Sequence, residues 1–222
     1  MYDLVVVGSS FSGLMTALSA HKSSKVLLVE KRKQPGSPVN STGAVPIEWL
    51  TKMDVMPSKD CIAGPLSGLE LISPNGESAV LKKSEPDGMV LYPDRYVKWL
   101  ADKVSDLGCT IMTDTTFKGI SSEKKNSKTK AAEKSEGSLT VSTNRGEFRT
   151  RYVVGADGAA SNVGLSVGLG ERPAPEDLHL GIEYHVSNNH IQDPEVFRLY
   201  LGHDVAPLGY AWSFPEGPDH LK

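Results

Sequence analysis

Residues 3–30 contain a strand, a glycine turn, a helix and a second strand, and this order restricts the fold more than any other feature of the sequence. Leu4–Val7 is a continuous apolar run. In Lys25–Val29, the four residues after Lys25 form a second apolar run. Such runs are typical of strands buried on both faces of a parallel sheet. Leu14–Ala20, rich in small and apolar residues, reads as the helix between them. We therefore predict a β-α-β unit and an α/β fold.

The turn inside this unit has the glycine spacing of a dinucleotide-binding loop. Its sequence is Gly8-Ser9-Ser10-Phe11-Ser12-Gly13. Gly8 permits the tight turn, and Gly13 lets the helix pack close to the strand. Ser10 is small enough for the backbone to approach a diphosphate, provided that its φ is not positive. The amides and the helix dipole would attract that anion, so the candidate cofactor residues are Gly8, Ser10, Phe11, Ser12 and Gly13.

An acidic residue ends the second strand. Glu30 lies about 20 residues beyond the turn, where a carboxylate accepts hydrogen bonds from an adenosine ribose. An acid there argues against a 2′-phosphate, and so against NADP in this site. We include Glu30 and Lys31 among the cofactor candidates. The alternative is a glycine-containing turn of an unrelated α/β protein, which the combined strand, turn, helix and Glu30 pattern disfavours.

A second motif follows at the end of the predicted sheet. Gly155-Ala156-Asp157-Gly158-Ala159-Ala160-Ser161-Asn162-Val163 resembles the G-A-D-G-x-x-S-x-V segment of FAD-dependent hydroxylases and geranylgeranyl reductases. The resemblance implies FAD as the cofactor. It also places Asp157 and Gly158 against the diphosphate–ribityl region, with Ser161 capping the next helix. The alternative interpretation is a plain Asp-Gly turn.

A third motif narrows the resemblance to one branch of that superfamily. Tyr210-Ala211-Trp212-Ser213-Phe214-Pro215 is similar to the Tyr-x-Trp-x-Phe-Pro motif of geranylgeranyl reductases, which helps to line their prenyl pocket. By alternation alone, Tyr210, Trp212 and Phe214 project from one face of a strand. Such a face can wall a lipid tunnel or form an ordinary aromatic core. The resemblance favours substrate binding by these three residues.

The sequence departs from the family pattern at three places. Ser41 stands in the slot of a cysteine near the flavin, which puts a cysteine-assisted step in doubt but leaves Gly43 as a cofactor candidate. Pro93 occupies the slot of a helix-starting arginine; Arg95 is nearby, out of register, and is kept as a candidate. The family's Gly-x-Gly would fall beyond Lys222, so we expect a missing C-terminal segment.

The pattern predicts a Rossmann-like FAD-binding domain with a β-meander and part of an antiparallel-sheet substrate domain. The first comprises residues 1–45 and 94–170, with 121–138 as an exposed insertion; the second comprises 46–93 and 171–222. Asp94–Leu107 has the apolar spacing of an amphipathic helix ended by Gly108. The other predicted strands are 109–112, 117–120, 139–153, Gly68–Ser73 before a Pro-Asn-Gly turn, Leu180–Val186, Val196–Leu201 and Tyr210–Phe214.

The resemblance implies an FAD-dependent oxidoreductase that reduces isoprenoid double bonds by flavin hydride transfer. It leaves NAD(P)H and ferredoxin open as electron donors, and no residue stands out as catalytic. Two alternatives are a flavin monooxygenase of the aromatic-hydroxylase type and an inactive nucleotide-binding fragment. Isoprenoid or lipid substrates are the expected partners.

Composition excludes several other classes. The net charge of -3 includes no basic excess for nucleic acid, and no apolar run approaches the roughly 20 residues of a membrane helix. Cys61 and Cys109 lack the spacing of a metal site, and we expect reduced thiols. We see no signal peptide and expect a cytoplasmic location. A lipid substrate is compatible with peripheral membrane contact, although no amphipathic anchor is visible.

Overall fold

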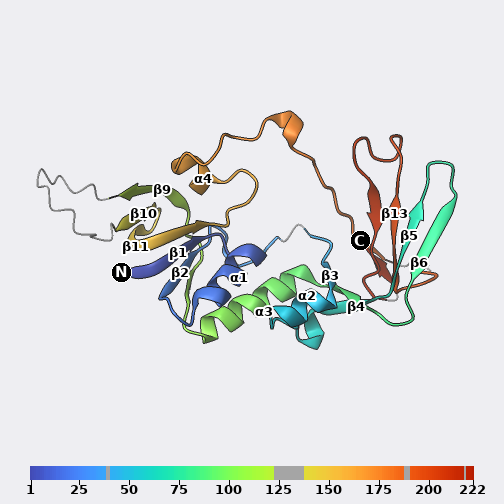
Figure 1. The fold of residues 1–222 in the computed structure, drawn as a ribbon, viewed down its shortest axis with the longest axis horizontal. Coiled ribbons are helices and arrows are strands. Elements are labelled where there is room, and N and C mark those ends of the chain that lie inside the picture. Colours follow the sequence, from blue (N-terminus) through green and yellow to red (C-terminus); the bar gives the residue numbers. More distant parts are fainter. Residues whose placement is uncertain (39–40, 123–137, 188–190, 218) are drawn as a thin grey trace, which may run out of the picture. The chain divides into compact units, whose positions relative to one another are not determined.

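The computed structural model describes residues 1–38, 41–122, 138–187, 191–217 and 219–222, and the chain forms two compact units (Figure 1). The first unit comprises Met1–Val39 and Leu100–His179, and the second comprises Asn40–Trp99 and Leu180–Lys222. The sequence predicts domain boundaries after residues 45, 93 and 170, whereas the two units divide after residues 39, 99 and 179. Helix α3 (Pro93–Asp106) supplies residues to both units, because it continues through the boundary at residue 99.

The first unit contains a six-stranded sheet in the order β8-β2-β1-β11-β10-β9. Strands β8, β2, β1 and β11 are parallel neighbours, whereas β9, β10 and β11 form an antiparallel meander. The elements are β1 (Tyr2–Val7), α1 (Phe11–Ala20), β2 (Val26–Val29), β8 (Thr110–Met112), β9 (Phe117–Ser122), β10 (Leu139–Thr143), β11 (Gly146–Gly155), α4 (Asn162–Ser166) and η2 (Pro175–Asp177). The predicted Rossmann-like fold with a meander is confirmed.

The core of this unit lies between the central strands and the helices. All four residues of β2 and the last four of β1 are buried, as expected for strands covered on both faces. Val5, Val7, Leu27 and Val29 form one cluster with Val141 and Val163. The turn after β1 therefore starts from a strand whose last four residues are fixed by packing in the core.

Two predicted boundaries in this unit need correction. Helix α1 begins at Phe11 rather than Leu14, because Ser10 has extended backbone angles and already serves as the N-cap. The predicted exposed insertion, 121–138, is too long at both ends. Ser121 and Ser122 complete β9, and Ser138 is buried, where its Oγ accepts a hydrogen bond from Arg149 Nη2 at 3.0 Å. The rest of the insertion, 123–137, lies outside the described residues.

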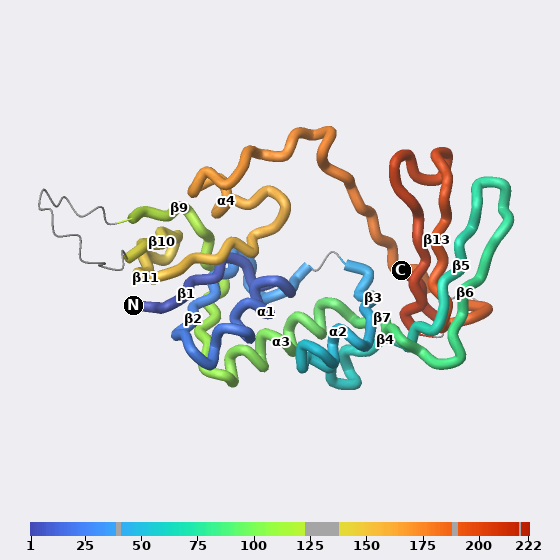
Figure 2. The backbone as a smooth tube through the Cα atoms, in the orientation of Figure 1, coloured from blue at the N-terminus to red at the C-terminus, as the bar shows by residue number. Residues whose placement is uncertain are grey.

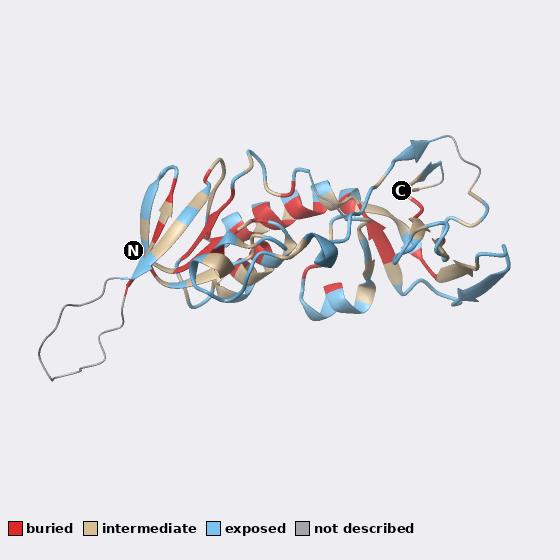
Figure 3. Cartoon of the chain, turned by 90° about the horizontal axis from the view of Figure 1, so that it is seen from above, coloured by how far each residue is buried: buried red, intermediate tan, exposed pale blue. Residues whose placement is uncertain are grey.

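The second unit contains three small sheets. Their strand orders are β14-β13-β5-β6, β3-β7-β4 and β12-β15. Strands β5 and β6 form the predicted hairpin (Figure 2), and the edge strand β6 is exposed throughout (Figure 3). The elements are β3 (Ala44–Pro46), α2 (Ile47–Lys52), η1 (Lys59–Cys61), β4 (Ile62–Leu66), β5 (Gly68–Ile72), β6 (Ser78–Lys82), β7 (Gly88–Leu91), β12 (Val186–Ser187), β13 (Val196–Tyr200), β14 (Ala211–Ser213) and β15 (His220–Leu221).

The C-terminal strands follow the prediction only in part. Strands β13 and β14 are antiparallel, as predicted, but β13 also pairs with β5 in parallel. The strand predicted over Leu180–Val186 is wrong for all but its last residue, since the only strand there is β12. Leu180 and Tyr184 are 87% and 72% exposed. Apolar alternation makes a strand only where another strand supplies hydrogen bonds, and β12 pairs with β15 over two residues.

Helix α3 agrees with its predicted periodicity. Val97, Leu100, Ala101 and Val104 are buried along one face, and Gly108 follows the helix with φ +88°. Leu107 was placed on the same face but is 42% exposed, because the helix ends at Asp106. A strong local period therefore located this helix to within one residue at each end.

Tyr96 of α3 should make the stability of the second unit sensitive to alkaline pH. Its buried hydroxyl donates to the Val55 carbonyl oxygen at 2.7 Å. Burial, and secondarily the Cys61 thiol, raise the pKa of the phenol above its ordinary value near 10. A raised folded-state pKa gives stability that is present in full below about pH 10 and is lost as the pH rises through the folded-state pKa.

We therefore expect the Tm of the chain to fall above about pH 10, and to fall less steeply in Tyr96→Phe. This variant should lose about 1 kcal/mol at neutral pH, because the Val55 carbonyl loses its donor. Tyr184→Phe, at an exposed ring, is the control. Parallel pH curves for the wild type and Tyr96→Phe would contradict the assignment.

Candidate dinucleotide-binding site

The turn between β1 and α1 has no room for side chains at its two glycines. Gly8 has φ +102°, and a Cβ there would lie 2.3 Å from the Ala156 carbonyl oxygen. A Cβ at Gly13 would lie 1.9 Å from the Gly8 carbonyl oxygen. Real Cβ atoms do not approach backbone this closely, so helix α1 can start beside β1 only with glycine at both positions.

Ser10 meets the condition set for the third position of the turn. Its φ of −77° and ψ of −172° are extended, so a side chain is tolerated. Ser10 and Ser12 are exposed, Phe11 is partly buried, and within the described residues the Ser10 side chain makes no capping hydrogen bond. The first turn of α1 also lacks an acidic residue. Since the first amides of a helix have no intrahelical acceptors, this N-terminus can bind an anion.

Glu30 is buried against the turn. Its Oε2 accepts hydrogen bonds from the Ser9 amide and the Ser9 hydroxyl, both at 2.9 Å, and its Oε1 accepts from the Arg32 amide at 2.9 Å. A carboxylate has about four acceptor positions, so one position remains for a ligand hydroxyl. The contact with ribose stays a prediction, and holding Ser9 is a role that sequence reasoning missed. Lys31, the next residue, is exposed.

The second cofactor motif meets this turn. The Ala156 amide donates to the Val7 carbonyl oxygen at 2.8 Å, which puts Asp157 directly after the strand beside β1. The Asp157 carboxylate accepts hydrogen bonds from Ser161 Oγ at 2.5 Å and from the Asn162 amide at 2.7 Å. Ser161 Oγ accepts from the Gly164 amide at 3.0 Å, which confirms the predicted cap. The Asp157 carboxylate therefore accepts hydrogen bonds from the residues that begin α4. Its spacing from Ser161 could have indicated this role.

Gly158 and Asp157 stay cofactor candidates through their position. Gly158 has φ +90°, and nothing lies within 4 Å of a Cβ built on it. Gly158 comes two residues after Ala156, whose backbone packs against Gly8, and no other atoms pack against the Cβ position of Gly158. Five of the predicted residues, Gly8, Ser10, Gly13, Glu30 and Asp157, gather at the carboxyl ends of β1, β2 and β11, where ligands bind in open α/β sheets.

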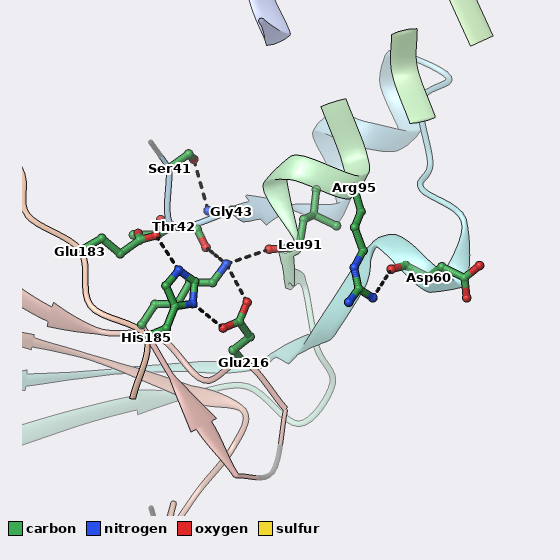
Figure 4. Close-up of polar contacts among 10 residues, drawn as sticks. Ser41, Thr42, Gly43, Asp60, Leu91, Arg95, Glu183, His185 and Glu216 are labelled. Atoms are coloured by element: carbon green, nitrogen blue, oxygen red, sulfur yellow. Dashed lines mark hydrogen bonds and ion pairs between the residues drawn. The ribbon is translucent and has the colours of Figure 1, made fainter. Parts of the chain in front are cut away.

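Gly43 and Arg95 lie in the second unit (Figure 4). The Gly43 carbonyl oxygen accepts from the Leu91 amide at 2.9 Å, and a Cβ at Gly43 would lie 2.3 Å from the Leu91 carbonyl oxygen. Arg95 Nη1 donates to the Asp60 carbonyl oxygen at 3.2 Å, and its guanidinium stacks 4.2 Å from the centre of the Tyr92 ring. The exposed Arg95 side chain is thus held by its own unit.

The aromatic motif divides between surface and core. Tyr210 is 53% exposed and meets the Trp212 ring edge-on, with centroids 6.0 Å apart. Phe214 is buried and stacks on Phe197 at 4.7 Å. Trp212 packs against the same cluster, which includes Leu66 and Val90. Phe214 therefore builds the core of its unit, whereas Tyr210 remains available to a ligand.

A cavity of about 580 Å³ lies in the second unit. Most of its lining is apolar, and Phe197 connects it to the aromatic motif. The lining comes from residues 44–46, 66–69, 81–83, 87–88 and 197. Sequence reasoning missed this cavity because no single segment contains its wall.

The described residues lack a metal-binding cluster and a membrane-spanning helix. They contain no group of three or more His, Cys, Asp and Glu side chains arranged to hold a metal ion. None of their helices has both the length and the apolar character needed to cross a membrane.

Comparison with known proteins agrees with the motifs. A family model for the geranylgeranyl reductase catalytic domain matches residues 177–221. The digeranylgeranylglycerophospholipid reductase of Methanocaldococcus jannaschii is 29% identical over 218 residues, which cover 98% of this chain and 53% of the relative. The chain resembles the amino-terminal portion of the geranylgeranyl reductase family. It spans about half the length of the curated relatives it matches.

Solved structures extend the geranylgeranyl reductase resemblance to the fold. A geranylgeranyl bacteriochlorophyll reductase-like protein from Thermoplasma acidophilum superposes with a TM-score of 0.76 at 25% identity, covering 99% of this chain and 55% of that one. A mutant of the halogenase PltM, solved with FAD, has a TM-score of 0.69 at 13% identity, covering 99% of this chain and 50% of that one. The second match shows a shared fold alone.

Proposed function

We propose that this chain is the amino-terminal part of an FAD-dependent reductase that saturates isoprenoid double bonds. One observation carries the proposal: the glycine turn and the Gly-Ala-Asp-Gly segment, about 150 residues apart in sequence, pack backbone to backbone at Gly8 and Ala156. The resemblance to geranylgeranyl reductases supports the choice of substrate.

The residues at the turn suit an FAD molecule. The backbone packs so closely at Gly8 and Gly13 that neither position has room for a Cβ. The amides around Ser10 and Ser12 would hold the diphosphate. The free acceptor position of Glu30 would receive an adenosine ribose hydroxyl. Asp157 and Gly158 would lie beside the diphosphate–ribityl region. Bound FAD would supply hydride chemistry, and this chain would supply orientation.

The second unit suits an apolar substrate. Its cavity has the size and lining of a small-molecule site, and Tyr210, the first residue of the motif that lines the prenyl pocket in the family, presents an exposed ring. NAD(P)H or reduced ferredoxin would deliver electrons. A lipid substrate would bring the protein to a membrane surface by peripheral contact.

Binding of ADP and FAD to the 222-residue chain tests the cofactor site. Ser10→Glu places a carboxylate where the diphosphate would lie, so we expect both dissociation constants to rise at least about tenfold in calorimetric titrations. Ser23→Glu makes the same change at an exposed serine beyond the other end of α1 and should leave them unchanged. A wild-type chain that binds neither ligand would contradict the proposal.

Product analysis separates the reaction classes. Given reduced flavin and a prenylated lipid, a reductase yields a more saturated chain. An oxygenated product would instead favour the monooxygenase alternative.

A further inference from the structure

Lys222 is a lysine with no exposed side-chain surface. Its Nζ lies 3.1 Å from Glu216 Oε1, 3.3 Å from the Leu91 carbonyl oxygen and 3.5 Å from the Thr42 carbonyl oxygen. An ammonium group has three donors, so these acceptors account for all of them. A buried charge is retained only when it is paired and hydrogen-bonded, and Glu216, 10% exposed, supplies the opposite charge.

The three acceptors belong to three separate segments of the second unit. Thr42 lies in the loop before β3, Leu91 ends β7, and Glu216 follows β14 (Figure 4). The loop around Thr42 is the Ser41–Gly43 stretch that matches the flavin loop of the family. Its Gly43 carbonyl oxygen is already bonded to the Leu91 amide, so Lys222 adds a second connection at the same point.

The cluster also reaches Arg95 and the protein surface. The Tyr92 ring contacts the Arg95 guanidinium at 4.2 Å and Lys222 Nζ at 6.0 Å from its centre. On the other side, Glu216 Oε2 lies 2.9 Å from His185 Nδ1, and the His185 side chain is 61% exposed. The two predicted cofactor residues of this unit, Gly43 and Arg95, are thus linked through Tyr92 and Lys222.

We propose that Lys222 is a positioning residue that fixes the Ser41–Gly43 loop for contact with the cofactor. Because its three donors are used inside the protein, Lys222 acts through the loop and does not bind the ligand itself. The identity of the loop's ligand rests on the proposed function. The ordering of the loop does not, and it can be measured without any ligand.

Hydrogen–deuterium exchange of the ligand-free chain tests the ordering. In Lys222→Met we expect the amides of Gly43 and Leu91 to exchange at least about tenfold faster, while the β5 amides keep their protection. Glu216→Gln should give a smaller increase, and Lys222→Arg should restore most of the protection. Lys52→Met removes an exposed lysine of the same unit and should change nothing. Unchanged exchange at Gly43 and Leu91 would overturn the inference, and so would a rise shared by β5.

Flavin spectroscopy tests the connection with the cofactor. In the FAD-bound chain, Lys222→Met should shift the visible flavin bands and raise the FAD dissociation constant about tenfold, with rescue by Lys222→Arg. Identical flavin spectra and affinities in the wild type and Lys222→Met would overturn the cofactor part. If the wild type binds no FAD while the exchange result holds, the proposed function fails and the ordering of the loop by Lys222 is supported.

Discussion

Replacing Gly13 with alanine is expected to lower the free energy of unfolding by about 3 kcal/mol or more. The new Cβ would lie 1.9 Å from the Gly8 carbonyl oxygen and 3.0 Å from its carbonyl carbon. The clashing atoms are backbone at the end of β1, a strand paired with β2 and β11, so they cannot move away without disturbing the sheet. We expect affinity for ADP to be lost together with stability.

Helix propensity alone predicts the opposite sign for this substitution. Alanine within a helix is favoured over glycine by about 1 kcal/mol, and Gly13 is the third residue of α1. Urea unfolding followed by circular dichroism therefore decides between the two effects. Gly119→Ala in β9 is the matched control, because nothing lies within 4 Å of its new Cβ. A Gly13→Ala chain as stable as the wild type would show that the turn is not packed as described.

Replacing Glu30 with alanine should be the second most damaging change. The substitution removes the acceptor of the Ser9 amide and the Ser9 hydroxyl, and Ser9 is fully buried. A buried donor left without an acceptor costs about 1–3 kcal/mol, so we expect a loss of roughly 3 kcal/mol. Loss of the Arg32 amide contact adds less, since that group is only partly buried. The dissociation constant for ADP should rise at least about tenfold.

Two companion variants make the Glu30 result interpretable. Glu30→Gln keeps the shape and one acceptor oxygen, so its loss of stability should be about half as large. Glu171→Ala removes an exposed carboxylate in the same unit and should stay within about 0.5 kcal/mol of the wild type. Equal stabilities for Glu30→Ala and Glu171→Ala would exclude a structural role for Glu30.

Features encoded within a short stretch of sequence could be predicted from it. The apolar run Leu4–Val7, the glycines of the following turn and the period of α3 each specify local structure, and all three agree with the structure. The Ser161 cap is equally local. In each case the interacting atoms are close in sequence, or the residue type alone fixes the backbone.

Features that depend on a distant partner could not be predicted. Alternation over 180–186 indicated a strand, yet pairing decides whether one forms, and the sequence does not state which strand is near. The parallel alignment of β13 with β5 joins segments more than 100 residues apart. Phe214 is buried because Phe197 of another strand stacks on it, a contact that alternation within one strand does not specify. The three acceptors of Lys222 come from segments that are separate in the sequence, so its burial could not be read from its neighbours.

The hydrogen bonds from Ser9 to Glu30 have a thermodynamic consequence for ligand recognition. They hold the turn in one conformation without any ligand, and the close backbone packing of Gly8 against Ala156 and of Gly13 against Gly8 supports the same conformation. A nucleotide arriving at α1 would meet a preorganised cradle, so association would sacrifice little chain entropy. Ordering of the turn would then offset less of the favourable free energy of the diphosphate contacts.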